Sequence, residues 1–403
     1  MKYLHYSMAT MFLTLWANLG LGQGTPPAVD EEFQEWLLEE LILAEPGATI
    51  TLPEGLYHLD TPLSITTNNV TLKGQGLQKT VLSFKPQTTG AEGLHVSGNG
   101  ITLTGFAIED TKGDGIKIMR ADGLVVDGVR VTWSNFADPA NGAYGLYPVQ
   151  SRRVLIQNSE VSGASDAGIY VGQSKDVVVR RNKVFHNVAG IEIENCMGAD
   201  VYDNHTFENT AGILVFNLPS IKTPGKGTRV YQNHIHKNNT VNFAAPSNMV
   251  AVVPQGVGVM VMANREVEIY DNDIVDHQTT SILLVSFYAT ALPIEDPAYE
   301  PFVEKVLIYG NQMIQDGYDP QGGSNDVSKQ SIAALRQIIG VPFPQIIFDG
   351  ATSPDASSDD AICITPDDRA TFINIDLLGD FKNISQDLAP HNCSHQRLKR
   401  VRL

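Results

Sequence analysis

Glu192 and Glu194 are the residues of this chain whose types and spacing are best suited to chemistry. They lie two positions apart in Gly190-Ile-Glu-Ile-Glu, where apolar and acidic residues alternate. Successive side chains of a β-strand point to opposite faces, so both carboxylates would project from one face with Cα atoms roughly 6.6 Å apart. Carboxyl pairs separated by about 5 to 9.5 Å act as acid and base on glycosidic bonds. The same pair would equally suit calcium ligation or plain surface charge.

The strand that carries these glutamates is one of three copies of a short phrase. Gly168-Ile-Tyr-Val, Gly190-Ile-Glu-Ile and Gly212-Ile-Leu-Val start 22 residues apart, and looser copies extend from Gly115 to Ser281. A fixed period of this length is typical of a solenoid, in which each repeat packs only against its neighbours. Apolar residues alternate instead of recurring at spacings of three and four, so the unit consists of strands. We predict an all-β fold, a parallel β-helix of about ten coils.

Stacked coils lie about 4.8 Å apart, so equivalent residues form columns along the solenoid axis. A turn residue follows the second short strand of most repeats, and its side-chain amide would donate to the same residue of the next coil. The glycine that opens each phrase indicates a corner with a positive φ or a close backbone approach. The residues expected in the column of turn residues are Asp127, Asn158, Asn182, Asn204, Asn233, Asn272 and Asn311.

The outward column that contains Glu192 also contains aromatic and basic residues from earlier coils. Tyr170 and Tyr147 suit a sugar chain, because an aromatic ring packs on the C–H face of a pyranose and carboxylates accept from its hydroxyls. A lyase or epimerase acting on uronic acids would need a base, a proton donor and a cation, roles that His186, Tyr170 and Lys117 can supply. We therefore predict catalytic residues Glu192, Glu194, Tyr170 and His186, and substrate-binding residues Lys117, Tyr147, Asp166 and Phe216.

The other end of this face is hydrophobic, with Leu214, Phe216, Met260 and Met262 at the outward positions. Either an insert covers these side chains or they form a docking surface for another protein. Four long inserts interrupt the repeats at 136–143, 219–228, 241–256 and 288–302. Binding residues of repeat proteins gather where loops lengthen on one side, so we expect the inserts to wall a groove.

Composition limits the partners of the chain. Its 403 residues carry a formal net charge of −17, with a pI near 4.9. This balance argues against nucleic acid binding and against metal-free capture of a polyanion. No cysteine spacing indicates zinc or haem, and calcium held between surface carboxylates stays open as a cofactor.

The chain begins with features of a secretory signal. Lys2 is followed by an apolar stretch over 8–21 and by small residues at Gly20, Gly22 and Gly24. The stretch is short for a membrane span, so we expect residues 1–22 to be a signal peptide and the mature chain to be periplasmic or secreted, without a transmembrane span.

The rest of the chain divides around the repeats. An amphipathic helix within 23–48 should cap the β-helix of 49–318, and residues 319–403 should form the last coils and a cover, ending in a solvated basic tail. Export permits disulfides, and a Cys363–Cys393 bridge is the best prediction, although the spacing does not decide whether it forms. Cys196 should be a small buried side chain.

Several stretches resemble a family of exported bacterial parallel β-helix repeat proteins. The resemblance rests on Ser165-Asp-Ala-Gly-Ile-Tyr-Val-Gly, Asn187-Val-Ala-Gly-Ile-Glu-Ile-Glu-Asn and Gly258-Val-Met-Val-Met-Ala-Asn-Arg. It implies a right-handed, distantly pectate-lyase-like β-helix of unsettled activity and a periplasmic c-type cytochrome as a partner. The Asp-Pro-His-Asp motif of alginate epimerases is absent from the sequence, since Ala389-Pro-His-Asn lies outside the repeats.

Two functions stay open at this stage. The first is an exported protein that binds a polysaccharide on the outward strand face and modifies or cleaves it, as a lyase, epimerase or glycoside hydrolase. The second is a non-catalytic periplasmic scaffold or partner protein, for example of a c-type cytochrome.

Overall fold

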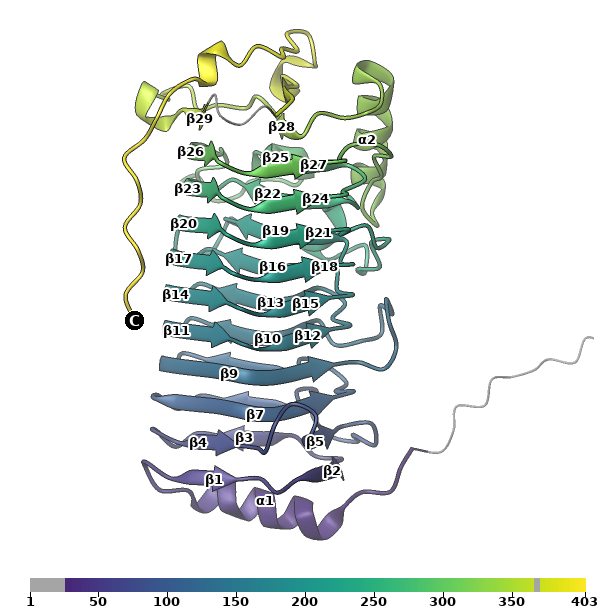
Figure 1. Ribbon diagram of the computed structural model, residues 1–403, viewed down its shortest axis with the longest axis vertical. Coiled ribbons are helices and arrows are strands. Elements are labelled where there is room, and N and C mark those ends of the chain that lie inside the picture. The colour runs from purple at the N-terminus through teal and green to yellow at the C-terminus, as the bar shows by residue number, and fades with distance from the viewer. Residues whose placement is uncertain (1–25, 366–369) are drawn as a thin grey trace, which may run out of the picture.

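The computed structural model describes residues 26–365 and 370–403, which form the predicted parallel β-helix (Figure 1). Its strands make two sheets, which we call sheet A and sheet B, of 19 and 11 strands. Each regular coil contributes one strand to sheet B and then two consecutive strands to sheet A, of which the second is the shorter. The 11 strands of sheet B show slightly more coils than the sequence predicted.

The strands of the two sheets have the following bounds. Sheet B consists of β3 (Leu63–Ile65), β6 (Leu94–Val96), β8 (Ile116–Met119), β10 (Tyr144–Val149), β13 (Ala167–Gly172), β16 (Ala189–Glu194), β19 (Ala211–Phe216), β22 (Val257–Met262), β25 (Thr280–Val285), β28 (Ile346–Phe348) and β30 (Phe372–Asn374). Sheet A consists of β1 (Thr49–Thr51), β2 (Gly55–His58), β4 (Thr71–Lys73), β5 (Thr80–Ser83), β7 (Ile101–Glu109), β9 (Asp122–Thr132), β11 (Arg152–Gln157), β12 (Glu160–Ser162), β14 (Lys175–Arg180), β15 (Lys183–Phe185), β17 (Met197–Tyr202), β18 (His205–Phe207), β20 (Lys226–Tyr231), β21 (His234–His236), β23 (Arg265–Tyr270), β24 (Asp273–Val275), β26 (Glu304–Tyr309), β27 (Gln312–Ile314) and β29 (Ile362–Ile364).

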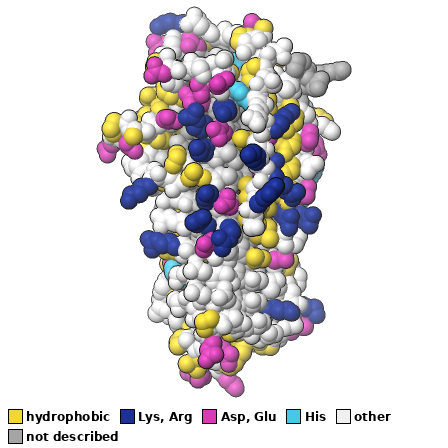
Figure 2. All heavy atoms as spheres, turned by 90° about the vertical axis from the view of Figure 1, so that its left-hand side faces the viewer, with side chains coloured by type: hydrophobic (Ala, Val, Ile, Leu, Met, Phe, Trp, Pro, Cys, Tyr) yellow, Lys and Arg dark blue, Asp and Glu magenta, His cyan; other side chains and the backbone are white. Residues whose placement is uncertain are grey.

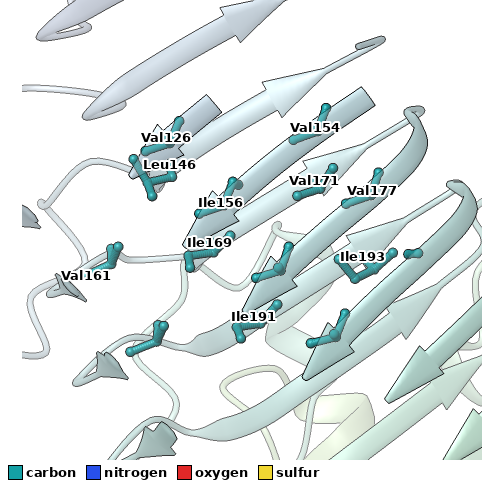
Figure 3. Close-up of a cluster of buried hydrophobic side chains, with 14 of the residues drawn as sticks. Val126, Leu146, Val154, Ile156, Val161, Ile169, Val171, Val177, Ile191 and Ile193 are labelled. Carbon is teal, nitrogen blue, oxygen red and sulfur yellow. The ribbon is translucent and has the colours of Figure 1, made fainter. Parts of the chain in front are cut away.

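The three copies of the phrase lie on three neighbouring parallel strands. Ile169 of β13 pairs with Ile191 of β16, which pairs with Ile213 of β19. These side chains point inward and are fully buried, and valines and isoleucines of sheet A face them across the interior (Figure 3). Burying branched apolar side chains in continuous columns supplies the main stabilisation of such a solenoid.

The predicted asparagine ladder is present from Asn182 to Asn311. Each side-chain amide donates to the Oδ1 of the next asparagine at 2.9 to 3.0 Å. Asn158 was placed wrongly in this ladder. It lies one residue before the ladder position, at a corner with a left-handed backbone conformation (φ 53°). Ser159 occupies the ladder position, and its backbone N–H donates to Oδ1 of Asn182. Asp127, which pairs with Gln157, is also outside the ladder. A second ladder that the sequence analysis missed runs through Asn187, Asn209 and Asn238 at another corner.

Close approach, rather than backbone conformation, explains the glycines that open the phrase. Gly168, Gly190 and Gly212 are outside the set of positive-φ glycines. A Cβ on Gly190 would lie 2.5 Å from the carbonyl oxygen of Gly212, so any larger residue would push the coils apart.

The ends of the solenoid are covered as predicted. Helix α1 (Glu31–Leu43) closes the N-terminal end and buries Leu37 and Leu41 (Figure 1). Near the other end, α2 (Asp326–Ile339) and short 3₁₀ helices cover the last coils. These 3₁₀ helices are η1 (Met249–Val252), η2 (Phe287–Thr290), η3 (Ser358–Asp360), η4 (Leu377–Gly379) and η5 (Ala389–His391).

The cysteines follow the sequence-based predictions. Cys363 on β29 and Cys393 in the C-terminal cover form a disulfide. Cys196 is buried in the core. The expected signal peptide, residues 1–22, lies outside the described residues. Within the described residues, no helix has the length and apolarity needed to cross a membrane.

The basic side chains of the C-terminal tail, Arg397, Lys399, Arg400 and Arg402, are exposed as predicted, but the tail is docked on the solenoid. It runs along sheet A, where Arg397 stacks on Tyr309 and the Val401 N–H donates to Asp200 at 3.1 Å. Lys and Arg side chains gather on the face that this tail crosses (Figure 2).

Candidate acid–tyrosine site

The four inserts lie at the two ends of the sheet B strands, where these strands begin and where they end. Residues 136–143 and 241–256 lead from sheet A into β10 and β22, whereas 219–225 and 288–302 lead out of β19 and β25. The connections on both sides therefore lengthen around one stretch of sheet B, as expected. They do not leave one continuous groove, because much of this stretch is buried; a separate apolar pocket lies further along, where Met260 and Leu283 face Ile332 of α2.

Three tyrosine rings meet on the outward face of sheet B. Tyr144 and Tyr147 of β10 contact Tyr170 of β13, with ring centroids 4.7 and 5.1 Å from it. The centroids of Tyr144 and Tyr147 lie 4.5 Å apart. Tyr170 is buried, while the other two are only half-buried. The rings therefore join the interior of the site to its surface.

Tyr170 leads directly to the predicted acidic pair. Its hydroxyl donates to Oε1 of Glu194 at 2.6 Å, and both side chains are buried. Burial raises the pKa of Glu194, although the hydrogen bond from Tyr170 acts in the opposite direction. The two groups form a buried hydrogen-bonded pair that can hold or pass a proton.

Glu192 and Asp166 complete the cluster. Glu192 is 2% exposed, and its Oε2 has no hydrogen-bond partner. Burial, together with the charges of Asp166 and Glu194, raises the pKa of Glu192 well above its usual value. Burial and Glu194 also raise the pKa of Asp166 to about 7. Carboxyl groups in such surroundings hold protons near neutral pH, as general acids do.

Lys117 lies at the exposed side of the tyrosines. Its Nζ is 5.5 Å from the ring centroid of Tyr147 and pairs with Glu92 and Asp114 at 3.6 and 3.7 Å. Its side chain is 28% exposed. Lys117 is thus positioned at the rim, but its charge is shared with two carboxylates of this chain.

His186 has its contacts elsewhere. Its Nε2 lies 2.8 Å from Oε2 of Glu208, and its ring packs on Phe136 and Phe185. None of these partners belongs to the acid–tyrosine cluster. The structure therefore does not bring His186 together with Tyr170, Glu192 and Glu194, and we leave it out of the site.

Phe216 was wrongly predicted to bind substrate, because it is fully buried. It belongs to an apolar cluster in which residues of inserts 241–256 and 288–302 pack against the outward face of β19 and β22. The Tyr299 hydroxyl reaches across to the backbone oxygen of Asn217 at 2.5 Å. Leu214, Met260 and Met262 are at most 3% exposed, so of the two alternatives for this face, cover by the inserts is confirmed and the docking surface is wrong.

Calcium does not fit the acidic cluster. Within the described residues, one group of three or more His, Cys, Asp or Glu side chains has its ligand atoms within 4.8 Å of one another, and it consists of histidines. The acids around Glu192 are outside that group, and burial favours their protonated forms, whereas calcium requires ionised carboxylates. We derive no chemistry through calcium.

Two residues of the acid–tyrosine site, Tyr144 and Asn248, were missed in the sequence analysis. Tyr144 lies where the next two coils have Ala167 and Ala189. Asn248, from insert 241–256, approaches Asp166 with its Nδ2 3.4 Å from Oδ2. The position of Tyr144 beside Ala167 was the only available signal.

Comparisons with known proteins agree with this architecture. Residues 64–225 match the family described as "Right handed beta helix region", so the β-helix is right-handed. No curated protein matches the chain. Among solved structures, the A-module of the mannuronan C-5 epimerase AlgE4 of Azotobacter vinelandii has 18% identity and a TM-score of 0.51. That match covers 74% of this chain and 87% of the A-module.

A second A-module, that of AlgE6 from the same organism, gives 17% identity and a TM-score of 0.51 over 72% of this chain and 87% of its own. A family 28 exopolygalacturonase of Yersinia enterocolitica gives 11% identity and a TM-score of 0.49, covering 72% of this chain and 63% of the enzyme. The chain is therefore a right-handed parallel β-helix protein, as its resemblance implied. At these identities the neighbours define the fold alone.

Proposed function

We propose that this protein binds a polysaccharide at the exposed side of Tyr144 and Tyr147 and modifies it by proton transfer through Tyr170 and Glu194. The observation that carries the proposal is the 2.6 Å hydrogen bond from Tyr170 to a buried Glu194. A fold needs no such pair at its surface-facing strand positions, and unpaired buried carboxyl groups cost stability. Perturbed acids gathered in one place are typical of functional sites.

The roles follow from burial. The half-buried rings of Tyr144 and Tyr147 offer faces on which a sugar can pack. At the rim, Lys117 can pair with a carboxylate of the sugar, and its partners Glu92 and Asp114 can accept hydrogen bonds from sugar hydroxyls. Tyr170 lies between these rings and Glu194, so a proton can move between the buried acid and a bound sugar through its hydroxyl. Glu192, whose pKa is raised well above its usual value, holds a proton and serves as the acid of the site, whereas Asp166, with its pKa raised to about 7, is only partly ionised at neutral pH.

Uronic acid polymers are the substrate class to test first. Once the charge of the C6 carboxylate is neutralised, the C5 proton becomes acidic enough for a base to remove it. An acid then either returns a proton to C5, which is epimerisation, or protonates O4 as the C4–O bond breaks, which is cleavage by a lyase. The mannuronan C-5 epimerase A-modules motivate this choice by their fold and names. Export to the periplasm or the medium, where such polymers occur, is part of the proposal. Mass spectrometry of the mature N-terminus would test it.

The experiment is an NMR assay of the full chain with mannuronan, polygalacturonate and a neutral glucan. We expect a change in uronate composition or chain length with the wild-type protein. Glu194→Gln and Tyr170→Phe should each lower the rate about 10²- to 10⁴-fold, as the loss of a general acid or base does. Glu160→Gln is the matched control, because Glu160 lies on sheet A and pairs with Lys183 at the surface. Absence of conversion and binding with every polymer, or unchanged rates in both site variants, would refute the proposal.

A further inference from the structure

Three histidines gather on sheet A, on a different face from the acid–tyrosine cluster. His205 of β18 pairs in register with His234 of β21, and His236 follows two positions later on the same strand. Alternation along a strand places all three on one outward face. Their candidate ligand atoms lie within 4.8 Å of one another.

The nitrogen atoms of His205 and His236 are already separated by nearly the distance that a metal imposes. Nε2 of His205 lies 3.2 Å from Nδ1 and 3.3 Å from Nε2 of His236. In a tetrahedral zinc site with Zn–N bonds of about 2.05 Å, ligand nitrogens are about 3.3 Å apart. The rings of His205 and His236 are nearly parallel, at 17°, so binding requires them to rotate about χ2 until both planes contain the ion.

A carboxylate orients the third histidine. Oδ2 of Asp273, the residue paired with His234 on β24, lies 2.7 Å from Nδ1 of His234. A hydrogen bond at Nδ1 fixes the tautomer and leaves Nε2 free as a ligand, which is the usual arrangement of a metal-bound histidine and its carboxylate. His234 would therefore bind the metal directly, and Asp273 would orient it.

We propose that His205, His234 and His236 bind a divalent transition-metal ion such as Zn²⁺, with Asp273 orienting His234. His234 is exposed and the other two are half-buried, so the fourth coordination position faces solvent. Three histidine ligands with one open position are the arrangement of catalytic rather than structural zinc.

The charges around the site are mixed. Lys183 lies in the same column on β15, but it pairs with Glu160 at 3.7 Å, and Lys237 approaches Asp276 at 4.0 Å. Asp273 adds negative charge on the opposite side of His234.

Isothermal titration calorimetry of the untagged, metal-free full chain with ZnCl₂ tests this proposal. We expect one Zn²⁺ per chain, a loss of affinity of at least about 100-fold in His205→Asn and in His236→Asn, and about 10- to 100-fold in Asp273→Asn. His95→Asn, on β6 of sheet B, is the control and should bind like the wild type. Circular dichroism confirms that the variants fold, and Co²⁺ should give the visible absorption of tetrahedral coordination. No binding by the wild type, or binding by His205→Asn and His236→Asn with the affinity of the wild type, would overturn the proposal.

Discussion

Two halves of the outward face of sheet B differ sharply although they belong to the same column of residues. The N-terminal half presents Lys117, Tyr147 and Tyr170, which are followed by Glu192. One coil further, Glu192 pairs with Leu214, and the column continues as Met260 and Leu283. The first half leads to solvent at Tyr147, whereas the second lies under the inserts.

The boundary between these halves explains the unusual carboxyl groups. Stacking forces each side chain to share its surroundings with the residues above and below it. Glu192 therefore has a tyrosine on one side and a covered leucine on the other, and no cation pairs with it. A repetitive scaffold can thus place an acid in an apolar environment by a change of chemistry between adjacent coils.

The covered half should depend most on its packing. Phe216→Ala removes a fully buried ring beneath the inserts and should lower the free energy of unfolding by about 3–5 kcal/mol. Urea denaturation followed by circular dichroism would measure this. Phe136→Ala, at a side chain 61% exposed, should change the free energy by less than about 0.5 kcal/mol. Similar losses for both variants would show that the ring of Phe216 is not packed beneath the inserts.

The hydrogen bond at the boundary should have a smaller effect. Tyr170→Phe removes the donor to Glu194 and should destabilise the protein by about 1–3 kcal/mol, because a buried acceptor loses its partner. It should also raise the pKa of Glu194 further, since this hydrogen bond lowers it. Denaturation and carboxyl NMR titration would measure the two effects. An unchanged titration would mean that Tyr170 does not bond to Glu194 in solution.

The pH dependence of stability should reveal the buried acids. The pKa of Asp166, about 7 in the folded chain, exceeds its unfolded value of about 3.9, so the folded state binds more protons between these limits. This contribution to stability is complete below about pH 4 and is lost as pH rises through 7. Denaturation series from pH 4 to 8 should show a smaller decline in Asp166→Asn than in the wild type. Because Glu192 and Glu194 act in the same direction, some decline should persist; parallel curves for the two proteins would contradict the assignment.

Much of the scaffold could be predicted because each repeat contains the same residues that determine its local structure. The 22-residue period, the alternating strands and the asparagines gave the coils, the inward columns and most of the ladder. The acids could be placed on one outward face for the same reason. Asn158 was misplaced because its one-residue offset is invisible without pairing, and the left-handed corner accepts several residue types.

Features set by the inserts could not be predicted. Burial of Phe216 depends on how the inserts 241–256 and 288–302 fold. These inserts lie outside the repeat, so the 22-residue period does not predict their conformation. Asn248 approaches Asp166 from 82 residues away. The histidine cluster, in contrast, was within reach of the sequence. Asn204 and Asn233 directly precede His205 and His234, so the ladder already aligned these rings.

The most direct test of the central claim is a single variant, Glu192→Leu, assayed for both stability and polysaccharide conversion. It extends the apolar column by one coil and removes a buried carboxyl group whose Oε2 has no partner. If the acids serve function rather than folding, the variant should be at least as stable as the wild type and should lose conversion of the polysaccharide. A strongly destabilised variant that retains wild-type conversion would contradict the account.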